Sequence, residues 1–303
     1  MPNVSVIIPT YQRANLVSQA IESVLAQTYT DYEIIVVNDG STDNTIEVLE
    51  YFGEKITVIH QENQGSAAAR NTGIKVAQGQ YIALLDHDDI WLPTKLEKQV
   101  SYLDSHPKIG LVYSDTLYFN EKGLLPGSHA KFFPVPPVLQ SWTLFVRNTI
   151  PTCSVVMMRR KCLDDVGLFD ETLPPCDDYD LWLRLVEKWP IHFLNEPLVH
   201  YRRYEGQQSN SEERMLLGLL RVKEKTFKRN KELQKLPLFV LDQCFYEGYL
   251  SLAYLYIQLY QGEKARLALN HYQQVRGINC YYKWLWMCSF PLLKPSSIEL
   301  QCR

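Results

Sequence analysis

Three closely spaced carboxylates, Asp86, Asp88 and Asp89, follow an apolar run at residues 81–85. Carboxylates this close repel one another and raise each other's pKa unless a cation lies between them. Oxygen ligands at this spacing suit Mg²⁺ or Mn²⁺, which keep water and phosphate oxygens in their other positions. A cap for the helix expected from residue 93 is the alternative, and it explains Asp89 without requiring Asp86. The spacing therefore favours a Mg²⁺ or Mn²⁺ site at Asp86 and Asp88, where the metal would neutralise a leaving diphosphate.

A second acidic group, at positions 177, 178 and 180, opens the helix expected at residues 178–189. Asp178 lies one turn before Trp182 on the inward apolar stripe, whereas Asp180 and Arg184 form an outward i,i+4 ion pair. Acids are common at helix N-termini, so capping is the alternative for this group. An acid aimed along the buried stripe is less common. Asp178 is therefore a candidate general base that takes a proton from an acceptor hydroxyl.

Asp39 follows another apolar run, at residues 33–37, and precedes Gly40. A carboxylate in this position can accept hydrogen bonds from the N–H of a base or from ribose hydroxyls. A plain Asx turn before a capped helix explains the same residues equally well. Both interpretations stay open at this point.

Small residues open the helix expected at residues 65–77. Backbone N–H groups at a helix start attract phosphate, and Arg70 would add a cation. The segment lacks the P-loop spacing and the dinucleotide glycine fingerprint, and the missing fingerprint argues against a dehydrogenase. Residues 200–204 would offer further cations to a diphosphate, and a basic surface strand explains them about as well.

Strands and helices alternate along the first part of the chain and place these side chains. Apolar runs predict strands at residues 4–9, 33–37, 56–59, 81–85 and 109–113, and helical periodicity predicts helices at 14–27, 65–77 and 93–103, with one more after residue 41. This alternation predicts an α/β fold, with a mostly parallel sheet covered by helices on both faces. Ligands bind such sheets beyond the C-terminal strand ends, where all the candidates after strands lie.

The alternation breaks after residue 115. Residues 120–150 hold Gly, Pro and scattered aromatics, which indicates a long functional loop or lid, and 153–158 reads as a further strand. From residue 212 the pattern is helical, with a hairpin of 239–260 and 263–275 broken at Gly262. We therefore expect a catalytic domain at residues 1–211 and a small helical region at 212–303.

The balance of acidic and basic residues also changes at residue 211. Residues 1–211 hold 17 Lys and Arg against 26 Asp and Glu, whereas residues 212–303 hold 14 against 8. Such a basic region suits an anionic membrane surface or a phosphorylated acceptor. Seven Cys without a CxxC pair favour reduced thiols in a cytosolic protein. The first residues do not read as a signal peptide, and the apolar stretch at 284–293 is about half the ~20 residues of a membrane span.

Five stretches in this order resemble family 2 glycosyltransferases of the GT-A fold. They are the runs VSVIIPTYQR at 4–13, VNDGSTD at 37–43, GSAAARNTG at 65–73, LLDHDD at 84–89 and DDYDLWLR at 177–184. The resemblance covers residues 1 to about 210. It implies the GT-A, Rossmann-like nucleotide-diphospho-sugar transferase fold for this part of the chain.

The resemblance also implies an inverting transfer from a nucleotide-diphosphate sugar, with a UDP-sugar favoured, usually with Mg²⁺ or Mn²⁺. Asp86 and Asp88 match the DxD motif, whose second acid chiefly meets the metal, and Asp178 matches the catalytic base. The nucleotide side would comprise Pro9, Thr10, Tyr11, Arg13, Asp39, Arg70, Asp86 and His87, with Asp39 on the nucleoside and residues 9–11 lining the base pocket. The acceptor would be a hydroxyl of a saccharide or lipid-linked sugar in polysaccharide biosynthesis of the cell envelope, and no nucleic-acid partner is expected.

Two positions depart from the family pattern. The usual Glu-Asp before the aromatic residue is Asp177-Asp178 here, which shortens the first acid and keeps the base. Family members often carry a His near the phosphates where this chain has Tyr204, although His200 is close in sequence. A metal or phosphate role for this segment therefore stays open.

Two other classes of protein remain as alternatives. A sugar nucleotidyltransferase would show a Gly-rich basic loop after the first strand, and residues 9–13 contain no Gly. A non-catalytic nucleotide-sugar-binding scaffold is expected to lose Asp86, Asp88 or Asp178, and all three are present.

The basic C-terminal region suggests where the protein works. Seven Lys and Arg lie within residues 221–235, and Trp284, Trp286 and Phe290 follow with Lys283 and Lys294. They predict peripheral membrane contact, and a solvated helix with a core-packed tail is the alternative. We expect a cytoplasmic protein with peripheral contact at the inner face of the cell membrane.

Overall fold

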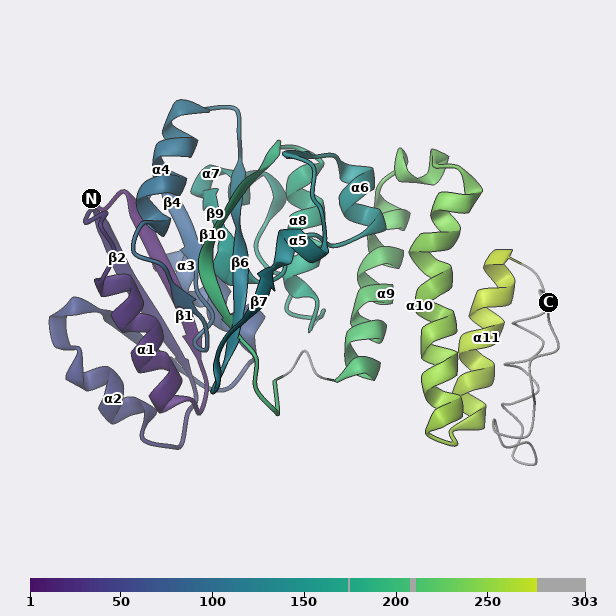
Figure 1. Cartoon of the computed structure of the whole chain (residues 1–303), viewed down its shortest axis with the longest axis horizontal. Coiled ribbons are helices and arrows are strands. Elements are labelled where there is room, and N and C mark those ends of the chain that lie inside the picture. Colours follow the sequence, from purple (N-terminus) through teal and green to yellow (C-terminus); the bar gives the residue numbers. More distant parts are fainter. Residues whose placement is uncertain (174, 208–210, 277–303) are drawn as a thin grey trace. The chain divides into compact units, whose positions relative to one another are not determined.

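The computed structural model describes residues 1–173, 175–207 and 211–276, and its first four main strands form a parallel sheet (Figure 1). Strand β1 (Val4–Thr10) is buried along its whole length. It pairs in parallel with β2 (Tyr32–Asp39) and with β4 (Tyr81–Leu84), and β2 pairs in parallel with β3 (Thr57–Gln61). Strands buried on both faces read as continuous apolar runs, which is why the sequence predicts them well.

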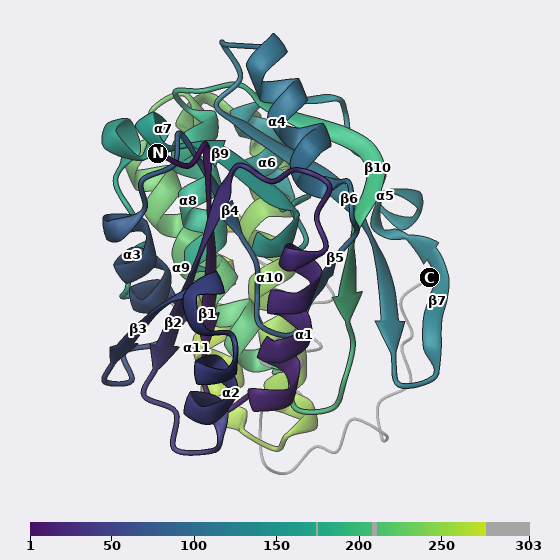
Figure 2. The same ribbon diagram turned by 90° about the vertical axis from the view of Figure 1, so that its left-hand side faces the viewer.

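Helices cover both faces of these strands. Figure 2 shows α3 on one side of β1 and β2 and α1 on the other. The helices are α1 (Ala14–Leu25), α2 (Thr45–Tyr51), α3 (Ser66–Val76) and α4 (Lys95–Ser105), with a short 3₁₀ turn η1 (Gly53–Lys55) before β3. Gly73 allows α3 to approach β1 closely, because a Cβ there would lie 2.6 Å from Cγ2 of Ile7.

The second half of the sheet is mixed. Strand β9 (Val156–Arg159) runs antiparallel between β4 and β6 (Leu111–Asn120), and β10 (Ile191–Arg202) pairs in parallel with β6. Strand β5 (Ile90–Trp91) pairs with β10, so the order is β3-β2-β1-β4-β9-β6-β10-β5. Strands β1, β2, β4, β6 and β10 consequently end at the same edge. The sequence predicted β6 and β9 but not β5 or β10.

The expectation of a long loop at residues 120–150 is wrong for most of that stretch. Strand β7 (Gly123–Ser128) pairs with β6, and β8 (Val138–Leu139) pairs with β10. Short helices α5 (His129–Phe132) and α6 (Ser141–Val146) accompany them. Gly and Pro interrupt these elements, so none is long enough to show a clear period.

Two further elements support the edge where the strands end, the 3₁₀ turn η2 (Cys153–Val155) and the start of helix α8 (Asp177–Val186). Helix α7 (Arg160–Val166) follows the antiparallel strand β9 and lies at the opposite edge. The sequence predicted α8 and missed α7. Trp182 of α8 is fully buried and packs edge-on against Phe169, which fixes the helix.

The described chain divides into two compact units. The first comprises Met1–Leu144 and Asn148–Gln207, and the second comprises Phe145–Arg147 with the described residues after Gln207. The sequence-based boundary was placed after residue 211 and did not assign Phe145–Arg147 to the second unit. These three residues are grouped with the second unit because the Phe145 ring packs against the rings of Phe227 and Phe245.

The second unit is helical in its described part, as predicted. It contains α9 (Glu212–Arg229), the 3₁₀ turn η4 (Leu233–Lys235), α10 (Leu238–Gln258) and α11 (Gly262–Arg276). Helices α10 and α11 form the expected hairpin. None of the described helices has the length and apolar character needed to cross a bilayer. The apolar stretch at 284–293 and the docking residues beyond 276 lie outside the described residues.

Candidate active site

Asp39 ends β2 and holds the turn before α3. One of its carboxylate oxygens accepts from Gln61 Nε2 at 2.7 Å and Gln64 N at 2.9 Å, and the other accepts from Gly65 N at 2.8 Å. Gly65 has φ +90°, a conformation that suits glycine. Asp39 does not form the Asx turn considered from the sequence, and the neighbouring Asn38 Oδ1 instead accepts from Ser41 N, three residues on, at 3.0 Å. A nucleoside contact of Asp39 stays a prediction, and its second oxygen, with a single protein donor, has room for one.

The end of β1 forms the wall of the predicted base pocket. The carbonyl of Pro9 lies 3.2 Å from Nδ1 of His87, which brings two predicted nucleotide residues together. Thr10 is buried, and among the described residues its hydroxyl has no hydrogen-bond partner. Tyr11 is 41% exposed, and Gln12 has φ +49°, an uncommon value for a residue other than Gly, Asn or Asp. An open aromatic ring and an unused hydroxyl are features that a ligand can engage.

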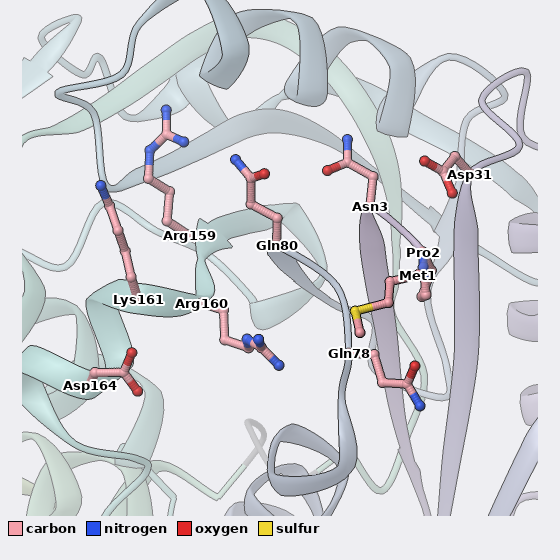
Figure 3. Close-up of a pocket in the computed structure, with 10 residues that line it drawn as sticks. All are labelled: Met1, Pro2, Asn3, Asp31, Gln78, Gln80, Arg159, Arg160, Lys161 and Asp164. Atoms are coloured by element: carbon pink, nitrogen blue, oxygen red, sulfur yellow. The ribbon is translucent and has the colours of Figure 1, made fainter.

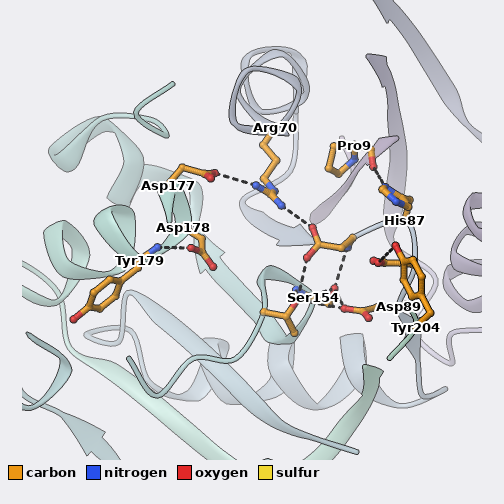
Figure 4. Close-up of polar contacts among 12 residues, drawn as sticks. Pro9, Arg70, His87, Asp89, Ser154, Asp177, Asp178, Tyr179 and Tyr204 are labelled. Atoms are coloured by element: carbon orange, nitrogen blue, oxygen red, sulfur yellow. Dashed lines mark hydrogen bonds and ion pairs between the residues drawn. The ribbon is translucent and has the colours of Figure 1, made fainter. Parts of the chain in front are cut away.

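Arg70 bridges two acids that are far apart in the sequence. Its Nη2 lies 2.7 Å from Asp86 Oδ1, and its Nη1 lies 3.0 Å from Asp177 Oδ2. Figure 4 shows Asp177 beside this guanidinium, with Asp178 and Tyr179 next in α8. A phosphate contact of Arg70 stays a prediction, but the guanidinium is buried and already held by two carboxylates.

The first acid of the DxD pattern is held from both sides. The second oxygen of Asp86 accepts from Thr152 Oγ1 at 2.9 Å, and its backbone N–H donates to Ser154 Oγ at 3.0 Å. Burial raises the pKa of Asp86, but the charge of Arg70 and the hydrogen bonds of Arg70 and Thr152 outweigh it and hold the pKa below its usual range. The residues of η2 were not singled out from the sequence as site residues, because small polar residues in an apolar run carry no distinctive spacing.

Of the acids in this loop, Asp88 is the one with a carboxylate oxygen that accepts no hydrogen bond from the described residues. Its Oδ2 accepts from Tyr204 Oη at 3.0 Å, and its carbonyl accepts from Arg202 Nε at 2.8 Å. Figure 4 shows Tyr204 on this side of the site, near His87. Tyr204, which stands where the family pattern has a His, therefore contacts the predicted metal ligand Asp88.

Asp89 has a structural position, though not the one considered from the sequence. It is buried and accepts from Ser154 Oγ at 2.6 Å and from the Arg202 backbone N–H at 3.0 Å. Its pKa is raised well above its usual value, first by burial and then by Asp88 and Asp86. The proposed helix cap at Asp89 is wrong, since Thr94 is the N-cap residue of α4.

The donor set fits a hard divalent cation that keeps other ligands. In the part of the chain that the structure describes, no three His, Cys, Asp or Glu side chains gather as a metal cage. Mg²⁺ is typically held by one or two carboxylates together with water and substrate phosphates. Asp88, with one oxygen not engaged by Tyr204, suits direct ligation better than Asp86, whose oxygens face Arg70 and Thr152.

Helix α8 presents its acids differently from the expected arrangement. Asp177 is the acid buried against Arg70, while Asp178 is half-buried and accepts from the Tyr179 N–H at 2.7 Å. Asp180 and Arg184 form the predicted ion pair at 2.7 Å, but Asp180 is fully buried, so the expected outward position is wrong. The reason is that Arg184 also donates to carbonyls of the preceding loop.

Asp178 has the electrostatics of a base that works near neutrality. Burial and the neighbouring charge of Asp177 raise its pKa to about 7, against the opposing effect of Arg70. Among the described residues, no Lys or Arg forms an ion pair with the Asp178 carboxylate. A half-buried carboxylate with this pKa can exchange a proton with a hydroxyl placed against it.

A cavity of about 570 Å³ lies at the opposite edge of the sheet (Figure 3). Asn3, Gln78, Gln80, Arg160 and Lys161 line it with other polar side chains. It contains none of the predicted site residues.

Sequence comparison relates this chain to known proteins. Residues 5–167 match the profile of "Glycosyl transferase family 2". The chain is 34% identical over 194 residues to the UDP-Glc:alpha-D-GlcNAc-diphosphoundecaprenol beta-1,3-glucosyltransferase WfgD of Escherichia coli, covering 63% of this chain and 73% of that protein. An uncharacterized glycosyltransferase of Rickettsia felis is 40% identical over 216 residues, 69% of this chain. The match spans only 35% of the R. felis protein.

Solved structures share the architecture. The S. aureus TarS 1–349 complex with UDP-GlcNAc superposes with a TM-score of 0.63 at 18% identity, covering 95% of this chain and 91% of that one. The mannosyltransferase PcManGT from Pyrobaculum calidifontis, in complex with GDP-Man and Mn²⁺, gives 0.64 at 19% identity, covering 94% and 79%. At these identities the likeness is one of fold.

Proposed function

The chain belongs to glycosyl transferase family 2 and has the GT-A fold, and we propose that it is an inverting, metal-dependent glycosyltransferase. It transfers a sugar from a nucleotide-diphosphate sugar, with UDP-sugars preferred, to a hydroxyl of a saccharide or lipid-linked acceptor. Asp178 is the general base. Asp88, with Asp86 beside it, would hold a Mg²⁺ or Mn²⁺ ion.

One observation supports this assignment most strongly. The Asp177–Arg70–Asp86 bridge ties the N-terminus of α8 to the DxD loop, with contacts of 3.0 and 2.7 Å. It links a carboxylate with a pKa of about 7 to a loop of carboxylates that suits a metal and a diphosphate. An inverting transferase requires a base on the acceptor side and charge neutralisation on the leaving-group side.

The chemistry is a single displacement. Asp178 accepts the proton of the acceptor hydroxyl as the acceptor oxygen forms a bond to the anomeric carbon. The bond from that carbon to the diphosphate oxygen breaks on the opposite face, so the configuration inverts. A bound divalent cation supplies Lewis-acid stabilisation of the departing nucleoside diphosphate. Arg70 keeps Asp86 ionised and Asp177 in place during the step.

The donor and acceptor classes are proposed from relatives. WfgD and WfaP of Escherichia coli are UDP-Glc:alpha-D-GlcNAc-diphosphoundecaprenol beta-1,3-glucosyltransferases. TuaG of Bacillus subtilis, 30% identical over 252 residues and covered over 93% of its length, is a putative teichuronic acid biosynthesis glycosyltransferase. We therefore assign this chain to envelope polysaccharide synthesis at the cytoplasmic face of a membrane.

The direct test replaces the base alone. Asp178→Asn is expected to lower the transfer rate by roughly 10²–10⁴-fold while UDP still binds in isothermal titration calorimetry with Mn²⁺. Asp164→Asn, at an exposed carboxylate lining the cavity of Figure 3, is the matched control and should keep the wild-type rate. Equal loss of binding and turnover in Asp178→Asn would make this residue structural and remove it as the base.

A further inference from the structure

Residues 131–142 form an apolar surface segment of the first unit, which we call the 131–142 segment. Phe132, Phe133, Val138 and Trp142 in it are 55%, 40%, 50% and 45% exposed. Single exposed apolar residues are ordinary on protein surfaces, but a contiguous run is typical of an interaction site. Three prolines at positions 134, 136 and 137 add further apolar surface to the same run.

The charged side chains in the sequence around this segment are basic, and the acids outside this stretch include exposed Glu121 and buried Asp115, which contacts Ala130. No Asp or Glu occurs anywhere in residues 122–163, although the whole chain contains 34. Lys131 is exposed within the segment, and Lys122 is exposed in the turn that leads into β7. An exposed apolar segment within a basic stretch of sequence complements an anionic partner.

The backbone of the segment is fixed to the sheet. At one end the Ala130 N–H donates to buried Asp115 at 2.9 Å, and His129 Nδ1 lies 2.7 Å from Tyr118 Oη. At the other end β8 pairs with β10, and the Pro137 carbonyl accepts from Phe193 N at 2.9 Å. Figure 1 shows α5 and β7 alongside β6. The exposed rings are therefore carried by a backbone that is hydrogen-bonded to the sheet at both ends.

We propose that the 131–142 segment docks the protein on an anionic lipid bilayer. Phe132 and Phe133 enter the boundary between headgroups and acyl chains, and Lys131 meets the lipid phosphates. Trp142 is suited to the same boundary because its ring is apolar while its Nε1–H, now bonded to Gln140, is polar. This surface lies in the first unit and is separate from the basic C-terminal region, and it does not depend on the proposed catalysis.

Vesicle co-sedimentation of the full chain tests this docking without any donor or acceptor. The full chain should sediment with vesicles of equal parts phosphatidylglycerol and phosphatidylcholine at low salt, and much less with phosphatidylcholine alone. Phe132→Ser/Phe133→Ser should weaken binding roughly tenfold or more, because two apolar rings no longer leave water. Ile46→Ser/Tyr51→Ser removes two exposed apolar side chains from α2 and should bind as the wild type does.

Two further variants keep the test independent of folding. Lys131→Glu should reduce binding to the anionic vesicles, and Trp142→Phe should remove part of the tryptophan quenching by lipids brominated near the headgroup. Full-strength binding by both Phe132→Ser/Phe133→Ser and Lys131→Glu would overturn the proposal and point to the C-terminal region. A wild-type chain that stays in the supernatant would also overturn it and favour a protein partner for this surface.

Discussion

The base of the proposed reaction is tuned by its neighbours. Burial and Asp177 raise the pKa of Asp178 to about 7, while Arg70 opposes them. The protonated carboxyl cannot accept a proton, so activity is absent well below this pKa and develops as the pH rises through it. We expect kcat/KM to increase between about pH 6 and 8 and then level off. A profile that is flat across this range would remove Asp178 as the titrating base.

The charge of Arg70 leads to a second prediction about the pH dependence of kcat/KM. Because its charge lowers the pKa of Asp178, Arg70→Met should move the rising limb to higher pH. Arg70→Lys keeps the charge and is the control, with a smaller displacement. The measurement is the pH dependence of kcat/KM for both variants. A limb that stays in place in Arg70→Met would show that the bridge does not act on the base.

Tyr204 is one of the two positions at which the sequence differs from the expected family pattern. Its hydroxyl donates to Asp88 Oδ2 and orients the carboxylate whose other oxygen is the proposed metal ligand. Hydrogen bonds to metal ligands typically contribute 10–100-fold in affinity. Tyr204→Phe should therefore weaken Mn²⁺ binding by roughly that factor, measured by the electron paramagnetic resonance signal of free Mn²⁺ with UDP present. Tyr51→Phe, which loses one exposed hydroxyl on α2, is the control, and equal affinity in Tyr204→Phe would leave Tyr204 without this role.

At the scale of elements, α3 is positioned by the absence of a side chain. A Cβ on Gly73 would lie 2.6 Å from Ile7 and 3.3 Å from Val37, within the packed face of β1 and β2. Gly→Ala in a helix interior ordinarily stabilises by up to about 1 kcal/mol. Here overpacking should reverse the sign, and we expect Gly73→Ala to reduce the free energy of unfolding in urea by roughly 1–3 kcal/mol. Lys75→Ala on the exposed face is the control, and a stabilised Gly73→Ala would contradict the close packing.

The elements that carry a strong period were predictable from the sequence. Strands β1, β2 and β4 are buried on both faces and read as apolar runs, and α1 shows its apolar stripe. Strand β10 was missed because a bulge near Pro197 and its mixed burial hide the alternation. The short elements between residues 123 and 146 were missed because Gly and Pro break them into pieces below one clear period.

Site residues followed the same division. Acids at strand ends were singled out because an apolar run that ends in carboxylates is unusual, and Asp178 was singled out through its helix position; their roles stay predictions. Thr152 and Ser154 were missed, because their role depends on β9 bringing η2 against the DxD loop. Long-range pairing of this kind leaves no local spacing to read.

At the scale of the whole molecule, the chain combines an acidic catalytic unit with a basic helical one. The boundary read from charge and periodicity falls after residue 211, and the contacts divide the described chain after Gln207. The difference at Phe145–Arg147 could not be read from the sequence, because three residues joining a distant helical unit produce no composition change. Neither unit contains, among the described residues, a helix able to cross a membrane.

The most direct measurement is the stereochemistry of transfer. The chain would be incubated with UDP-Glc or UDP-GlcNAc, Mn²⁺ and a GlcNAc α-diphosphate carrying a short alkyl chain, and the product followed by proton NMR. UDP release without added acceptor is followed in parallel, so that a poor acceptor is distinguished from an inactive site. The account predicts a β-linked product from the α-linked donor with wild-type protein, and no product with Asp178→Asn. An α-linked product, or bound UDP-sugar that yields neither product nor UDP, would contradict an inverting transferase.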